Sequence, residues 1–188
     1  MNRRRFAITM IAVAAIGLLA YRLRGVYMFL DIPPHIGDGE FQNISRRDGP
    51  LVMNGYRINS DPIDLSNDYE RKMAISRLPN IGVNCKLFFV IEGLDNRLEE
   101  RELRHRLGHA KTALELKDSR GKAIASIKGY LRDLVLSTRM DRLELYPLPF
   151  HVFAPDSNES YTLTISYTGD PKLASINGYA WIQCGGRK

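Results

Sequence analysis

Hydrophobic and polar residues alternate most regularly near the C-terminal end of the chain. In residues 161–168, Tyr161, Leu163, Ile165 and Tyr167 alternate with threonine and serine. A period of two places the apolar side chains on one face of a β-strand and the polar ones on the other. This pattern predicts a strand with one buried face and one face in water.

Residues 82–93 are apolar at both alternating sets of positions. Cys85, Leu87 and Phe89 share one face of the predicted strand, whereas Phe88 and Val90 lie on the other. A strand without a polar face is typical of a sheet centre that is covered on both sides.

Short apolar runs bounded by glycine, proline, asparagine or aspartate predict the other strands. These runs cover residues 41–45, 51–58, 62–65, 69–77, 111–117, 123–131, 134–138, 142–146, 150–153 and 176–184.

A single segment has a helical pattern. The predicted helix covers residues 96–107, with Asp95 or Asn96 as N-cap, Glu99 placed to complete a capping box and Gly108 just past the end. Because its apolar residues are few, we expect a solvated helix across one end of the sheets.

These elements predict a mainly β fold. We expect an antiparallel β-sandwich, Ig-like or jelly-roll in style, with one short helical insertion. An N-terminal transmembrane helix is expected to precede it.

That helix is expected within residues 1–30. Arg3, Arg4 and Arg5 precede the uncharged, largely apolar residues 6–21, which is the pattern of an export signal. The arginines are expected to stay in the cytoplasm, so that the rest of the chain is translocated.

Length and flanking residues disagree about cleavage of this segment. Sixteen helical residues rise roughly 24 Å, slightly less than a hydrocarbon core of about 30 Å, which favours a cleaved signal peptide. However, no small-x-small site directly follows, and Arg22 and Arg24 can reach the membrane interface. We expect a signal anchor, a single pass through the inner membrane and a periplasmic C-terminal domain. Secretion to the periplasm after cleavage is the alternative.

The rest of the chain divides into two parts. Residues 31–50 are rich in proline and glycine and are predicted to be a linker. Residues 51–188 are predicted to form the extracytoplasmic sandwich domain, and their number is sufficient for a real hydrophobic core.

The positive charge of the chain is concentrated at its start. The formal net charge is +6, but five of the 27 basic residues precede the first acidic residue, Asp31, and the remainder is nearly neutral. We therefore expect no nucleic-acid partner.

Motifs for catalysis, metals and cofactors are missing from the sequence. It contains no Gly-x-Ser-x-Gly motif, and Gly108 is expected to end the helix between His105 and His109. We expect no catalytic, metal or cofactor-binding residues and no enzymatic activity.

The two cysteines have two open interpretations. Cys85 and Cys184 each share a face with apolar residues of their strand, so both are expected in the core. They can form a disulfide in an oxidising compartment, or remain two buried free thiols.

Two groups of residues are candidates for an interaction surface. Tyr179 and Trp181 share one face of the last strand, where aromatic side chains can contact a sugar or a partner protein or belong to the core. Arg101 and Arg104 lie in the densely charged helical insertion, which can form the rim of an interface.

The C-terminal third resembles a group of known domains. Residues 150–155, 161–167 and 176–188 resemble the closing strands of small exported bacterial β-sandwich domains of unknown function. The resemblance implies an envelope location and no particular reaction.

The combined expectation is a membrane-anchored, extracytoplasmic protein-interaction module. It would bind the membrane through the N-terminal helix and a protein partner through the sandwich, as an immunity-type protein or an envelope-assembly subunit. The alternative is an envelope enzyme or carbohydrate binder whose site is assembled from residues distant in sequence.

Overall fold

The computed structural model describes residues 16–17, 32–48, 51–94, 98–139, 142–147, 149 and 151–185. The predicted membrane segment, residues 1–30, therefore lies outside the described residues apart from Ile16 and Gly17, which are helical. None of the helices within the described part of the chain combines the length and apolar character needed to cross a bilayer.

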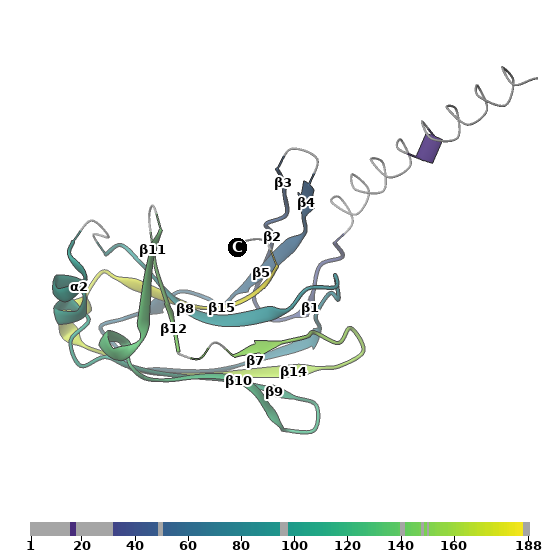
Figure 1. Ribbon diagram of the computed structural model, residues 1–188. Coiled ribbons are helices and arrows are strands. Elements are labelled where there is room, and N and C mark those ends of the chain that lie inside the picture. Colours follow the sequence, from purple (N-terminus) through teal and green to yellow (C-terminus); the bar gives the residue numbers. More distant parts are fainter. Residues whose placement is uncertain are drawn as a thin grey trace, which may run out of the picture.

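The described chain is mainly β and forms two antiparallel sheets that pack as layers (Figure 1). Sheet A has the order β1 (Ile36–Gly37), β7 (Tyr69–Arg77), β14 (Tyr161–Thr168), β9 (Lys111–Asp118) and β10 (Ala123–Tyr130). Sheet B has the order β11 (Val135–Arg139), β12 (Arg142–Tyr146), β8 (Cys85–Glu92), β15 (Asn177–Gly185), β5 (Gly55–Asn59) and β2 (Glu40–Asn43).

Smaller elements complete these layers. In sheet B, β6 (Ile63–Asp64) pairs with β15, and β13 (Val152–Phe153) pairs with β8. A separate hairpin consists of β3 (Arg46–Asp48) and β4 (Leu51–Met53). The helical elements are α2 (Glu100–Arg106), η1 (Leu131–Asp133) and η2 (Pro171–Leu173).

The four central strands of each layer follow a nested pairing scheme. In chain order these eight strands are β5, β7, β8, β9, β10, β12, β14 and β15. The pairs run from the two ends of this list inward: β5 pairs with β15, β7 with β14, β8 with β12, and β9 with β10. These pairs alternate between sheet B and sheet A, so the chain crosses repeatedly from one layer to the other.

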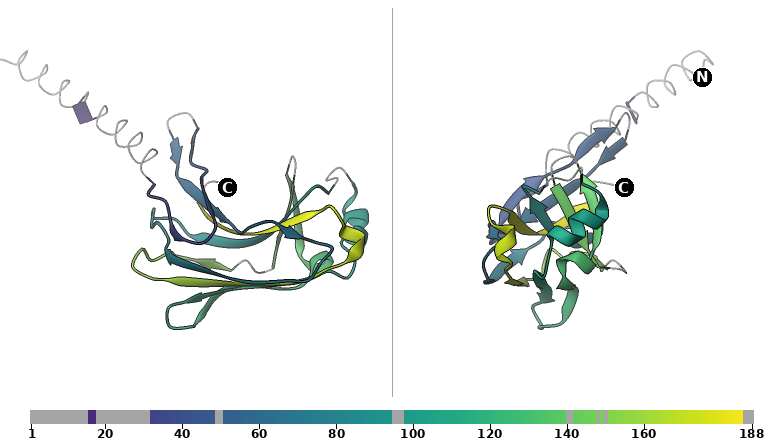
Figure 2. Two further views of the ribbon diagram at one scale, coloured as in Figure 1. Left: turned by 180° about the vertical axis from the view of Figure 1, so that it is seen from behind. Right: turned by 90° about the vertical axis from the view of Figure 1, so that its left-hand side faces the viewer.

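Sheet B is curved. Its β11–β12 end and its β2–β5 end both bend away from sheet A, and the β3–β4 hairpin continues the second bend (Figures 1 and 2). The outer face of sheet B, which points away from sheet A, is therefore concave. We call it the concave face.

The core lies between the two sheets, as the alternating burial of the side chains of β14 shows. Its residues Tyr161, Leu163, Ile165 and Tyr167 are all buried, whereas the alternating threonines and serine point outward. Tyr167 stacks on Phe89 of sheet B with ring centroids 5.8 Å apart. The predicted alternation of β14 is therefore confirmed.

Strand β8 is buried on both faces, as its sequence predicted. Leu87 and Phe89 face the core, whereas Phe88 (7% exposed) and Val90 (0%) lie on the concave face with Trp181 in a second apolar cluster. The outer face of sheet B is thus not an ordinary solvated face.

Helix α2 is shorter than predicted. It begins at Glu100, because Glu99 has an extended backbone and is itself the N-cap, without a side-chain cap hydrogen bond. The predicted N-cap residues Asp95 and Asn96 lie outside the described residues. The predicted end is confirmed, since Gly108 follows it with a φ of 55°, which favours glycine. Leu103 and Leu107 are fully buried, so a narrow apolar stripe fixes the helix to one end of the sandwich.

Part of the predicted linker, residues 31–50, belongs to the two sheets, including a strand close to the one predicted at residues 41–45. Residues 36–43 form β1 in sheet A and β2 in sheet B, separated only by Asp38 and Gly39. Gly39 has a φ of 95°. The Asp38 N–H donates to the Ala74 carbonyl at 2.8 Å, and the Ala74 N–H donates to Asp38 Oδ2, also at 2.8 Å. Glycine thus allows the chain to turn sharply from one sheet to the other. A glycine-rich composition alone does not distinguish such a turn from a linker.

Cys85 and Cys184 are directly opposed on β8 and β15 and are joined by a disulfide in the structure. The cysteines lie 99 residues apart in the sequence. Closure of a loop of about 100 residues is worth about 4–5 kcal/mol in the entropic model.

We expect exported protein that is alkylated without reduction to carry no label on Cys85 or Cys184, as measured by intact mass. Replacement of both cysteines by alanine should lower the free energy of unfolding by about 2–5 kcal/mol in urea. Reduced wild-type protein is the matched control, because it keeps both sulfur atoms and loses only the bond. Two labelled thiols in the exported protein would exclude the disulfide.

Candidate functional site

Two separate surfaces carry the candidate interaction residues. One is a pocket of about 620 Å³ at the α2 end of the sandwich, which we call the end pocket. The other is the concave face of sheet B. The residues that line the end pocket are Glu99, Arg101, Glu102, Arg104, His105, Gly108, His109, Arg132 and Lys172.

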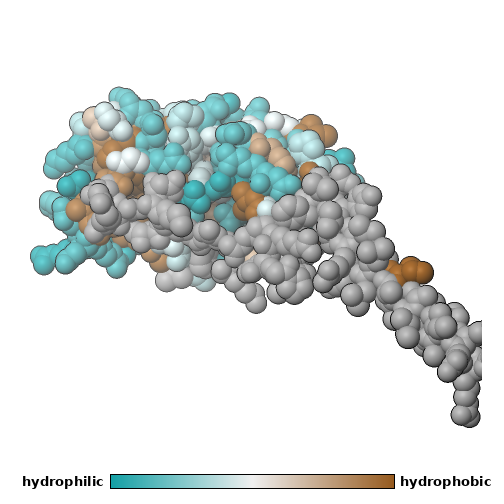
Figure 3. Space-filling model, turned by 90° about the horizontal axis from the view of Figure 1, so that it is seen from above, coloured by the Kyte–Doolittle hydropathy of each residue, from teal (hydrophilic) through white to brown (hydrophobic). Residues whose placement is uncertain are grey.

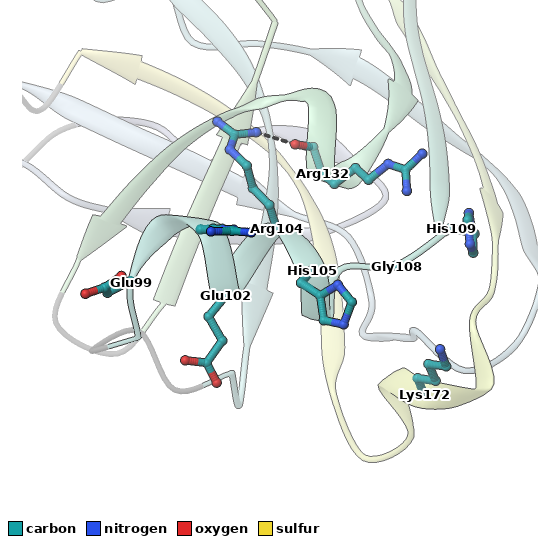
Figure 4. A pocket seen from close by; sticks show the side chains of 9 residues that line it. Glu99, Glu102, Arg104, His105, Gly108, His109, Arg132 and Lys172 are labelled. Atoms are coloured by element: carbon teal, nitrogen blue, oxygen red, sulfur yellow. Dashed lines mark hydrogen bonds between the residues drawn. The ribbon is translucent and has the colours of Figure 1, made fainter.

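The end pocket is formed by α2, the turn that follows it, η1 and η2. Figure 4 shows Arg132, His109 and Lys172 on one side and Glu99 and Glu102 on the other. Residues that are distant in sequence therefore place several cationic side chains around one hollow.

Arg104 lines the end pocket and has a structural role there. Its guanidinium donates to Glu100 Oε1 at 2.6 and 2.9 Å. It also donates to the backbone carbonyls of Arg132 and Leu134, the latter at 3.1 Å. Arg104 thus ties α2 to η1 and the residue after it, and its hydrogen-bonding groups are largely occupied.

Asp170 connects the two loops that carry His109 and Lys172. It is 8% exposed, and its carboxylate accepts the backbone N–H of His109 at 3.1 Å and that of Lys172 at 3.0 Å. These hydrogen bonds lower the pKa of the Asp170 carboxyl. A side chain at Gly108 would collide with this carboxylate, so the glycine is needed for close approach as well as for its backbone conformation.

His105 and His109 lie on either side of the helix end. The helix ends at Arg106, so the two residues do not share a helical face, and the His109 backbone is held by Asp170 beyond the helix end. No group of three or more His, Cys, Asp or Glu residues within the described ranges could hold a metal ion.

The centre of the concave face is a stack of guanidinium groups on an indole. Arg57 of β5 lies 3.8 Å from the Trp181 ring centroid, and Arg142 of β12 lies 4.8 Å from it. Trp181 itself is only 2% exposed. From this side the visible described residues are largely hydrophilic, with hydrophobic residues in separate patches (Figure 3).

Carboxylates and polar groups surround this stack. Arg57 donates to Gln42 Oε1 at 2.6 Å, and Arg142 lies 3.4 Å from Glu144, which is 5% exposed. Burial lowers the pKa of the Arg57 guanidinium, and the charge of Arg142 lowers it further, against the opposing effect of nearby glutamates.

Two donors in the stack have no acceptor. Trp181 Nε1 and Arg57 Nε are buried and make no hydrogen bond to any residue that the structure describes. Buried donors are normally satisfied, so this is an unusual feature of the concave face.

The four residues chosen from the sequence fall on different surfaces. Tyr179 and Trp181 lie on the concave face, whereas Arg101 and Arg104 line the end pocket. Sequence reasoning missed Arg57 and Arg142, because their approach to Trp181 depends on the order of strands in sheet B. It also missed the other cationic residues of the end pocket, which come from connections between strands: Arg132 and Lys172.

No family model matches the chain, and no curated protein matches it. One similar solved structure is the arabinose-bound MgGH51 α-L-arabinofuranosidase, with 13% sequence identity and a TM-score of 0.24. The match covers 82% of this chain but only 23% of that one.

We expect Asp170→Asn to lower the free energy of unfolding at pH 7 by about 1–3 kcal/mol, because the amide cannot accept both backbone N–H groups. The pH dependence should also change. Since the folded pKa of Asp170 is lowered, its contribution is complete above the ordinary carboxyl pKa of about 3.9 and is lost as the pH falls through the folded pKa.

Urea unfolding at pH 7 and at pH 3 measures both effects. The variant should lose less stability than wild type between these two values. Glu70→Gln on the outward face of β7 is the control, and it should change stability by less than about 0.5 kcal/mol at pH 7. Equal acid-induced losses in wild type and Asp170→Asn would contradict the role of Asp170.

Proposed function

We propose that this chain is a membrane-anchored, extracytoplasmic protein-interaction module that binds its partner through the concave face. The partner is proposed to be a protein, such as a toxin that the chain neutralises or another subunit of an envelope assembly. The observation that carries the proposal is the difference between the outer faces of the two sheets.

The outer face of sheet A is an ordinary solvated surface. Its exposed positions include Glu70 and Lys72 of β7, Thr162 and Ser166 of β14 and Lys128 of β10. The concave face instead holds Phe88, Val90 and Trp181, with Tyr146 and Tyr179 packed against them. A second apolar cluster on the outside of a sandwich is not needed to hold its two layers together.

The residue types of the concave face are those that contribute most to protein interfaces. Trp, Tyr and Arg are enriched among interface residues whose loss strongly weakens binding, and here Trp181, Tyr179 and Arg57 lie together. The unpaired donors Trp181 Nε1 and Arg57 Nε could be satisfied by carbonyl or carboxylate groups of a partner.

The carbohydrate-binding alternative has less support. Sugar rings stack on an aromatic face that is open to solvent. In this structure two guanidinium groups lie over Trp181, and the side chain is 2% exposed. A sugar would therefore have to displace at least one arginine.

The proposed location and fold have their own support. A disulfide between Cys85 and Cys184 fits an oxidising compartment such as the periplasm, and the basic, apolar segment in residues 1–30 fits an inner-membrane anchor. The nested pairing of the eight central strands supports the jelly-roll form of the sandwich over the Ig-like form.

We expect the full chain, expressed in a bacterium, to remain with the membrane fraction after an alkaline carbonate wash. Protease added to spheroplasts should degrade the C-terminal domain, because the arginines hold the N-terminus in the cytoplasm. A cytoplasmic protein that survives in intact spheroplasts is the control. Recovery of the full-length chain in the soluble cytosol would contradict the proposed location, and a shortened periplasmic product would indicate cleavage.

We expect a photo-crosslinking amino acid in place of Tyr179 to capture one stoichiometric protein partner in living cells. The same amino acid in place of Thr162, on the outward face of β14, should capture none. Binding of the purified partner should weaken about 30-fold or more in Arg57→Ala, the range expected for a dominant interface residue.

Arg57→Lys is the matched variant, because it keeps the charge and loses the planar stacking group. It should also weaken binding if the stack contributes to the interface. Equal capture from the Tyr179 and Thr162 positions, or unchanged partner affinity in Arg57→Ala, would contradict the proposal.

A further inference from the structure

The end pocket is separate from the concave face and has an excess of positive charge that the proposed function does not use. It has four Arg or Lys side chains and two histidines against two glutamates. Not all of these charges are equally available, so the ion pairs of each residue decide what the pocket can bind.

The negative charges in and around the pocket are mostly neutralised. Glu100, beside the pocket, pairs with Arg104 at 2.6 Å. Glu102 pairs with Arg106, which is not among the lining residues, at 3.5 Å. Glu99 is the other acidic residue of the lining.

The positive charges are more available. Arg101 and Lys172 are exposed and form no ion pair with any residue in the described part of the chain. Arg132 makes a long contact, at 3.8 Å, with Asp133, and its guanidinium lies 5.1 Å from the Tyr130 ring centroid. Three cationic groups from α2, η1 and η2 thus line the pocket, and the Asp170 carboxylate beside Lys172 is a partial counter-charge.

The backbone around these groups is held in place. Asp170 fixes the backbone of His109 and Lys172, and Arg104 fixes the carbonyls of Arg132 and Leu134. A ligand would therefore order side chains but not the loops that carry them, which lowers the entropic cost of binding.

We infer that the end pocket binds the phosphate or carboxylate group of a small soluble ligand. Arg and Lys are the usual partners of such oxyanions, since a guanidinium can donate two parallel hydrogen bonds to them. The volume of about 620 Å³ lies within the range of small-molecule sites, roughly 300–1,000 Å³.

The position of the pocket disfavours a lipid headgroup of the membrane that holds the chain. Strand β1, near the start of the described body, lies at the opposite end of the sandwich from α2 (Figures 1 and 2). Eight-residue strands such as β14 span roughly 26 Å between these ends. The pocket therefore opens far from the side where the chain enters from its proposed anchor.

Calorimetric titration of the full chain in neutral detergent, at constant ionic strength, tests this inference. The probes are inorganic pyrophosphate, citrate and phosphatidylglycerol dissolved in micelles of the same detergent. We expect saturable binding of pyrophosphate or citrate, and a loss of at least about tenfold in affinity in Arg101→Gln/Lys172→Gln, because both charged hydrogen-bond donors are removed.

The control variant is Lys72→Gln/Lys128→Gln, which removes the same charge from the exposed outer face of sheet A and should bind as wild type does. Equal losses in both double variants would mean a non-specific charge effect and would overturn the inference. Absence of saturable binding, or binding to the phosphatidylglycerol micelles alone, would also overturn it. Capture at the Tyr179 position should be unaffected by the pocket variant, so failure here is distinct from failure of the proposed function.

Discussion

The pairing of β8 with β15 is the constraint on which the rest of the structure depends. The centre of this ladder is apolar on both faces, so water is excluded there from two sides. Its register opposes Cys85 to Cys184 and Phe88 to Trp181. A register shift by one residue would move every side chain of the shifted strand to the other face. It would therefore separate the two cysteines and disrupt both the core and the concave-face cluster.

This double burial explains why the two outer faces of the sandwich differ. Sheet A needs only its inner face for the core, and its outer face carries ordinary polar side chains. Sheet B keeps aromatic residues on its outer face and covers them with Arg57 and Arg142. The arginines reduce the exposed apolar area while they keep a surface whose residue types suit a protein partner.

The helical end has a different physical origin. Leu103 and Leu107 fix α2 by apolar packing, while Arg104 and Asp170 satisfy backbone groups of neighbouring loops. These two charged residues therefore serve the fold, whereas Arg101 and Lys172 remain directed to solvent around the end pocket. Some charged residues in this region therefore hold the pocket together, and others are available to bind a ligand in it.

The sequence by itself determined the strands, because alternation and turn residues are local: β7, β12 and β14 begin and end where the pattern predicted. It also determined the buried character of both faces of β8. Only the tertiary structure decided that residues 36–37 form an edge strand of sheet A, and which residues meet around Trp181 and in the end pocket. Those contacts depend on strand order and on crossings between layers, which join residues far apart in sequence and leave no local pattern.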